Sequence, residues 1–141
     1  MSTSTIRIIT GLVLIIHGIG HAMAFFPALN IFSNEKWHYR SWLLSGFLGD
    51  TVSRVLVIIL FGGALIGFIA ASLGLFGWLI PHSAWQTLAI VSAVISLVAL
   101  SLFWNSFASL FPNKIGAILV DVTTLWALLG SGSFSETIKN L

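Results

Sequence analysis

The sequence predicts an all-α fold: an integral membrane four-helix bundle with a membrane-surface loop between its first two helices. Charged residues make up only 7% of the 141 residues, whereas a soluble domain carries about 25%. Hydrophobic residues make up 57%, and the mean hydropathy is +1.05. So few charges cannot cover a soluble globule, and so many apolar residues exclude a disordered chain. The surrounding medium is therefore expected to be lipid.

The first helix is predicted at residues 7–27. Arg7 precedes an apolar run that ends at Pro27, and a membrane helix needs about 20 such residues. The triplet Ala22–Ala24 also resembles a signal-peptide cleavage site. Two histidines directly before this triplet are unusual for a cleaved signal, so we favour a retained membrane helix.

Three further helices are predicted at about residues 53–80, 84–111 and 114–130. Pro81 and Pro112 fall between these runs, where a helix has to end in any case. With the first helix they form a single transmembrane domain that covers residues 1–141.

The one long polar stretch lies within residues 28–52. Trp37, Tyr39 and Trp42 stand beside charged residues there, a composition that suits the headgroup level of a bilayer. The apolar run at 41–48 is too short to cross. We expect a surface loop, partly helical, that covers one end of the bundle.

Small residues recur along the second helix at spacings of three and four. Lipid tails are as apolar as leucine, so membrane helices associate through close packing at small residues. Gly63 and Gly67 form a GxxxG pair, and Gly74 continues their face. We expect these glycines to pack against a neighbouring helix, in this chain or in another.

His17 and His21 are the most unusual residues of the first helix. Their spacing of four places them on one helix face, and ionisable residues inside a membrane are functional candidates. They are candidates for ligating the metal of a haem or chlorin, for chelating a transition ion, for moving a proton or for hydrogen-bonding a quinone. The structural alternative is a hydrogen bond across the bundle, or a position near the membrane interface.

Asp121 is the only carboxylate well inside a predicted helix, and Thr124 lies on its face one turn later. An ionised carboxylate there needs a cation or strong donors. We expect a His–Asp pair with His17 or His21; a pair with Lys114 and a wet cleft are the alternatives. Asn105 is expected to form an interface or interhelix hydrogen bond.

Several functions are excluded or unsupported. The absence of cysteine excludes a thiol–disulfide relay, a thiolate-held iron–sulfur cluster and covalent c-type haem. A net charge of +2 spread over ten charges does not indicate nucleic-acid binding. No nucleotide-binding, hydrolase or metal-ligand motif occurs, so no catalytic residue and no metal ligand set is predicted.

Short motifs resemble the DoxX and DoxX-like families, which are small four-helix bacterial and archaeal membrane proteins. The motifs are Arg7–Leu12 (RIITGL), then His17-Gly18 and His21, and Phe103–Asn105 (FWN) before the helix that holds Asp121. Some relatives are subunits of quinone-linked sulfur oxidation or of oxidative-stress complexes, and many have no assigned role. The resemblance implies the fold and a place in a complex, and it carries over no catalytic residue.

Taken together, the sequence predicts a non-enzymatic subunit or accessory component of a larger complex in a prokaryotic cytoplasmic membrane. Its partners would be the lipid bilayer and other membrane subunits or copies of itself, and not nucleic acid. One alternative is a redox-linked anchor that binds haem, a pigment or a quinone through His17 and His21. Another is a small proton-coupled transporter that uses Asp121.

Overall fold

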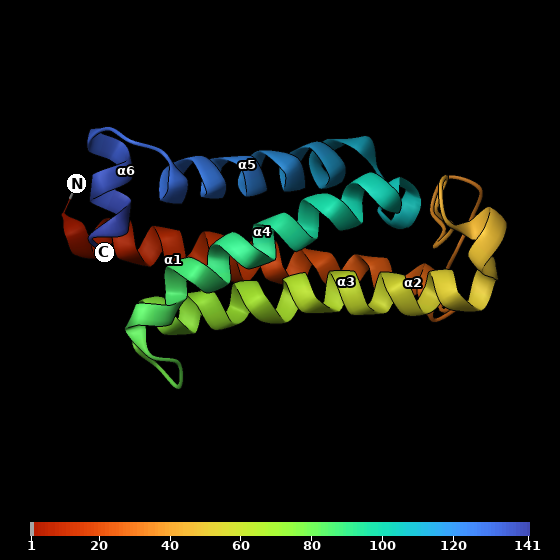
Figure 1. Cartoon of the computed structure of the whole chain (residues 1–141), viewed down its shortest axis with the longest axis horizontal. Coiled ribbons are helices and arrows are strands. Elements are labelled where there is room, and N and C mark those ends of the chain that lie inside the picture. Colours follow the sequence, from red (N-terminus) through yellow and green to blue (C-terminus); the bar gives the residue numbers. More distant parts are fainter. Residues whose placement is uncertain (1) are drawn as a thin grey trace.

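The computed structural model describes residues 2–141, and its regular secondary structure over that range is helical. The four long helices are α1 (Thr3–Gly20), α3 (Ser45–Leu75), α4 (Trp85–Leu102) and α5 (Ile115–Leu129) (Figure 1). Shorter elements extend or connect them: η1 (His21–Ala24), α2 (Phe25–Ala28), η2 (His82–Ala84), η3 (Trp104–Ser106), the π-helical turn η4 (Leu110–Lys114) and α6 (Ser133–Lys139).

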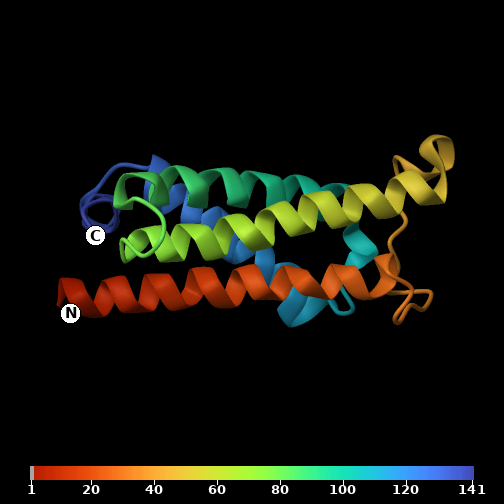
Figure 2. The ribbon, with the colours of Figure 1, turned by 90° about the horizontal axis from the view of Figure 1, so that it is seen from below.

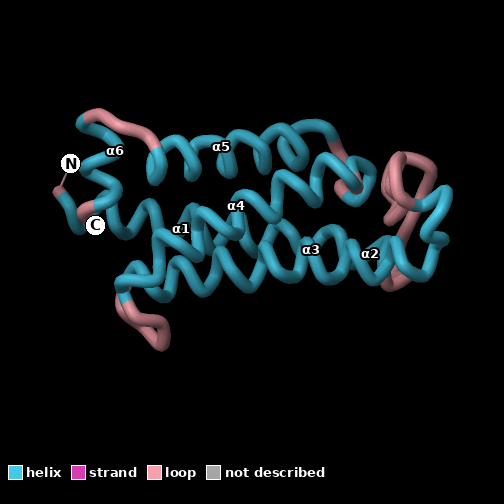
Figure 3. The backbone as a smooth tube through the Cα atoms, viewed as in Figure 1, coloured by secondary structure: helices cyan, strands magenta, loops and turns pink. Residues whose placement is uncertain are grey.

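The four long helices run lengthwise beside one another, and the connections lie at the two ends of the molecule (Figure 3). Helix α3 packs against both α1 and α4, and α4 also packs against α5 (Figures 1 and 2). The two termini and α6 lie at one end. The segments 29–44 and 103–114 lie at the other (Figure 1).

Three helical segments are long and apolar enough to cross a membrane: Thr3–Ala28, Ser45–Leu75 and His82–Leu102. A fourth is counted only if Leu110–Leu129 and Ser133–Lys139, which are bent by 90° relative to each other, are taken as one span. The all-helical prediction is therefore confirmed, with three to four candidate spans.

The first two helices start earlier than predicted. Helix α1 begins at Thr3 because the Ser2 hydroxyl accepts a hydrogen bond from the backbone N–H of Thr5. Helix α3 begins at Ser45 rather than at residue 53. The apolar run predicted as part of the surface loop forms its first turn, and the helix then kinks at Gly49, where φ is 78°.

The third helix ends earlier than predicted, at Leu102 instead of residue 111. Phe103 leaves the helical region with φ −121° and ψ 51°. The chain then turns through η3, which places the side chains of Phe103 and Phe107 in the core. Burial of two phenylalanines, which a straight helix would not provide, accounts for the early end.

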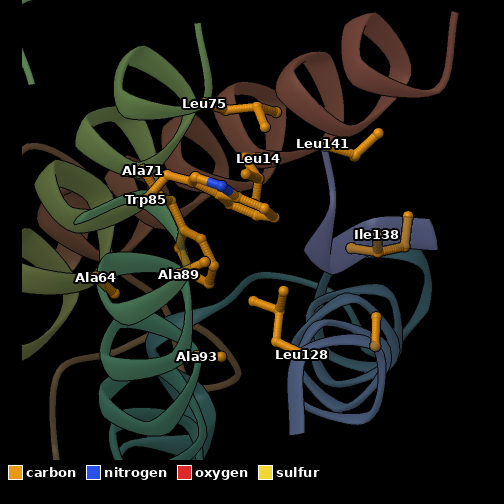
Figure 4. Close-up of a cluster of buried hydrophobic side chains, with 12 residues drawn as sticks. Leu14, Ala64, Ala71, Leu75, Trp85, Ala89, Ala93, Leu128, Ile138 and Leu141 are labelled. Atoms are coloured by element: carbon orange, nitrogen blue, oxygen red, sulfur yellow. The ribbon is translucent and has the colours of Figure 1, made fainter. Parts of the chain in front are cut away.

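Apolar side chains between the helices form two buried clusters. The first surrounds Trp85 at the start of α4 and includes Leu14 of α1 and Leu128 of α5 (Figure 4). The second includes Phe61 of α3 and Phe103. In an apolar medium such clusters hold helices together by close packing rather than by the hydrophobic effect.

Two of the three glycines predicted to pack do so. A methyl group at Gly67 would collide with the Ser92 hydroxyl of α4, and at Gly74 it would lie 3.2 Å from the Trp85 Cβ. An added Cβ at Gly63 would have no neighbour within 4 Å in this chain, so a contact of Gly63 with another chain stays a prediction. The contact with α4 therefore includes Gly67 and Gly74 but not Gly63.

Candidate functional site

Four polar side chains from three helices meet inside the protein, between the two apolar clusters. His17 lies in the last turn of α1, and His21 opens η1 one turn later. Asp121 lies in the middle of α5, and Ser96 lies in α4. The spacing of four residues that placed both histidines on one face brings their ring centroids to 4.8 Å. We call these four residues the polar centre.

A hydrogen-bonded chain links the three helices at the polar centre. His17 Nε2 donates to Asp121 Oδ1 over 2.8 Å, and Ser96 Oγ donates to Asp121 Oδ2 over 2.5 Å. The Asp121 side chain is 0% exposed, and His17 is also buried. The predicted His–Asp pair between the first and last helices is confirmed, and His17 is its imidazole.

Lys114, the other predicted partner of Asp121, points elsewhere. Its Nζ donates to Asn105 Oδ1 over 3.4 Å and lies 5.0 Å from the centre of the Trp104 ring. Thr124 makes no hydrogen bond to Asp121 in the part of the chain that the structure describes. The second donor is Ser96, which was not among the residues predicted from the sequence to lie at the site.

His21 is the exceptional member of the polar centre. Its side chain is 1% exposed, yet neither ring nitrogen has a hydrogen-bond partner among residues 2–141. The rings of Phe61, Phe68 and Phe107 surround it at centroid distances of 5.8 to 6.0 Å. A buried polar group normally has a partner, because losing its water contacts costs about 1–3 kcal/mol.

A cavity of about 380 Å³ opens beside the polar centre, between α1 and α5. Both histidines line it, with apolar side chains of the two helices and of the connection to α5. Its lining includes His17, His21, Met23, Phe107, Gly116 and Val120. We call this space the histidine cavity. It gives a guest molecule direct access to His21.

A second cavity of about 380 Å³ lies in the same groove, closer to the termini. It is bounded by α1, α5, Trp85 of α4 and residues of α6, and Thr124 is one of its few polar residues. We call it the apolar cavity. Val13 and Val120 line both cavities, so the two are neighbours along the groove.

A separate polar cluster lies at the end of the molecule opposite the termini. The backbone N–H of His38 donates to the Asn105 carbonyl over 2.8 Å, and the Asn105 amide lies 3.2 Å from His38 Nε2. His38 Nδ1 accepts the backbone N–H of Arg40. Partial burial lowers the pKa of His38 below its ordinary 6.5, and the nearby charges of Arg40 and Lys114 lower it further. Asn105 therefore forms hydrogen bonds, as expected, and those to His38 join η3 to a residue outside the helices.

The polar centre offers three groups that bind metals or hydrogen-bonding ligands. One ligand atom each from His17, His21 and Asp121 lies within 4.8 Å of the others. Ser96 Oγ is hydrogen-bonded to Asp121 and not to an imidazole, so the pairing of a nucleophile with its base is not formed. The arrangement is therefore suited to binding rather than to nucleophilic catalysis.

Comparisons of the chain with protein-family models, with curated proteins and with solved structures found no match. Any functional conclusion therefore depends on the geometry of the polar centre and on the sequence motifs.

Proposed function

We propose that the chain is an integral membrane protein whose four long helices form a transmembrane bundle in a prokaryotic cytoplasmic membrane. What supports this is the apolar character of the outer helix faces. Ile16, Ile66 and Leu119 are 68%, 67% and 59% exposed, and water would disfavour that much apolar surface on a small protein. Acyl chains would cover it.

Within this bundle we propose that the polar centre binds a small lipophilic ligand with a hydrogen-bonding head group, of the quinone type. The observation that carries the proposal is His21, which is fully buried, unpaired and next to a cavity. A quinone carbonyl would accept a hydrogen from the imidazole and supply the missing partner. The three phenyl rings around His21 favour a narrow head group over the broad macrocycle of haem or chlorin.

The test is to purify the protein from its native membrane in mild detergent, extract it with organic solvent and identify what co-purifies by absorption and mass spectrometry. We expect a quinone-class molecule in the wild type and its loss from His21→Phe. His82→Phe is the matched control, because His82 is exposed and outside the polar centre. No lipophilic ligand, or one retained by His21→Phe, would contradict the proposal.

We further propose that the protein acts as an accessory, non-enzymatic subunit of a larger membrane complex, in line with the resemblance to DoxX proteins. A binding centre without a paired nucleophile is suited to holding a ligand for a catalytic partner. Mild solubilisation tests this directly. A stable monomer that purifies with no companion protein would show the subunit proposal to be wrong.

Proton-coupled transport through Asp121 stays a prediction. Both carboxylate oxygens are hydrogen-bonded, to His17 and Ser96, so proton exchange would require breaking contacts that hold three helices together. Uptake into vesicles that Asp121→Asn leaves unchanged would exclude this function.

A further inference from the structure

We propose that the polar centre also holds one divalent transition-metal ion, ligated by His17 Nε2, a ring nitrogen of His21 and the Asp121 carboxylate. This inference rests on the proposed function, in that it takes the polar centre to be a binding site. It selects one of the roles that the sequence left open for His17 and His21, and it names Asp121 as the third ligand.

The ligand atoms are almost at the separation that a metal requires. Zinc-like ions bind imidazole nitrogen and carboxylate oxygen at about 2.0–2.2 Å, so tetrahedral ligand atoms lie about 3.3 Å apart. His17 Nε2 and Asp121 Oδ1 are 2.8 Å apart, and all three ligand atoms lie within 4.8 Å. A movement of the His21 ring by about 1.5 Å toward the other two completes the set.

The charges of the polar centre favour a cation. The groups that bond to Asp121 are an imidazole and a hydroxyl. Lys114, which directly precedes α5, is hydrogen-bonded to Asn105 instead. A buried carboxylate without a full positive partner is costly in an apolar medium. A divalent ion would take the place of the hydrogen between His17 Nε2 and Asp121 Oδ1, and the single hydrogen of the neutral His17 ring would move from Nε2 to Nδ1.

The surrounding groups also match those of known metal sites. Two histidines and one carboxylate are a donor set used by zinc and by non-haem iron. Ligating carboxylates are normally oriented by a hydrogen bond from outside the ligand set, which Ser96 Oγ provides. The fourth coordination position would face the histidine cavity, where an oxygen of the lipophilic ligand, or water, completes the shell.

The experiment is a titration of the purified, chelator-treated protein with Co²⁺, followed by visible absorption and calorimetry. We expect one Co²⁺ per chain and the intense visible bands of a tetrahedral ion. His17→Gln, His21→Phe and Asp121→Asn should each abolish these bands. Ser96→Ala should keep the bands and weaken the affinity about 10- to 100-fold, because Ser96 only positions a ligand.

Two histidine variants outside the polar centre provide matched controls. His38→Gln and His82→Gln remove an imidazole without touching the ligand set, so Co²⁺ binding should stay at the wild-type level. Helix content by circular dichroism and elution volume in detergent identify any variant that fails to fold. Ser96→Ala is the smallest change, so the affinity prediction remains testable even if a ligand variant misfolds.

Three results would overturn the inference: no Co²⁺ binding by the wild type, unchanged binding by His21→Phe and Asp121→Asn, or loss of binding in the two controls. Organic extraction of the same chelator-treated protein separates this inference from the proposed function. A lipophilic ligand retained by a protein that binds no Co²⁺ overturns the metal site alone. Absence of both overturns the metal site and the proposed function together.

Discussion

The histidine cavity and the apolar cavity have the same volume, about 380 Å³, and lie along the same groove between α1 and α5. They differ in chemistry. The walls of the apolar cavity are almost wholly hydrocarbon, which a lipid chain satisfies without any specific contact. The histidine cavity contains a buried imidazole with two unpaired nitrogens. The comparison teaches that two cavities of equal volume can differ in whether a buried polar group there lacks a partner, and this difference is the reason for proposing the ligand at the histidine cavity.

The largest expected loss of stability comes from removing the hydrogen bonds of Asp121. Asp121→Ala leaves His17 and Ser96 buried without a partner, and breaking a buried pair in this way costs about 3–5 kcal/mol. Thermal unfolding in detergent micelles measures the loss. Asp50→Ala is the control, because its pair with Arg40 is exposed and should contribute little to the stability. Equal losses would show that the polar centre is not structural.

The next largest loss of stability is expected at the contact between α3 and α4. Gly67→Ala places a methyl group against Ser92, whose hydroxyl donates to the Leu88 carbonyl, and we expect a loss of about 1–3 kcal/mol. Gly63→Ala, one turn away, meets open space and should not lower the stability. Unfolding midpoints of the two variants provide the measurement. A larger loss at Gly63 would contradict the packing described above.

Filling each cavity in turn tests the comparison directly. Gly116→Leu fills the histidine cavity and should weaken retention of the lipophilic ligand at least about tenfold, or about 1.4 kcal/mol. Thr124→Phe fills the apolar cavity by a similar volume and should leave retention unchanged. Each purified variant is diluted into increasing volumes of detergent buffer, and the amount of ligand still bound per protein measures its retention. The reverse pattern would place the ligand in the apolar cavity.

The smallest expected effect is a pH dependence of the segment that holds His38, which, unlike His21, has hydrogen-bond partners. Because the pKa of His38 is lowered in the folded protein, the unfolded segment takes up a proton first as the pH falls through about 6.5. The local stability of residues 29–44 should therefore fall between pH 7 and pH 5 and level off below the folded pKa. Hydrogen exchange of their backbone amides measures this change. His38→Gln should remove the pH dependence, and a segment that tightens on acidification would refute the assignment.

Much of the fold could be predicted from the sequence because the signals are local. Long apolar runs separated by prolines are visible one segment at a time, and they correctly predicted an all-helical chain. They predicted four membrane helices, and the structure has three to four candidates. The predicted ends of the helices were less accurate. The end of α4 at Leu102 depends on the burial of Phe103 and Phe107 against other helices, which a local pattern does not contain.

The polar centre was predictable in part. His17, His21 and Asp121 stood out because charged and polar groups are rare in apolar helices, and the His–Asp pair followed from the need of a carboxylate for a donor. The role of Ser96 was missed, since a serine in a membrane helix serves packing or hydrogen bonding equally well. Its assignment required the position of α4 relative to α5, which brings Ser96 Oγ to 2.5 Å from Asp121.

The sequence by itself determined the helical class and the few polar residues inside the apolar runs, because composition and the spacing of residues along one helix are properties of single segments of the chain. Only the tertiary structure decided which of those residues meet. It paired His17 rather than His21 with Asp121, turned Lys114 to Asn105 and left His21 without a partner beside a cavity. Such pairings join residues up to 104 positions apart, and their choice depends on how whole helices pack.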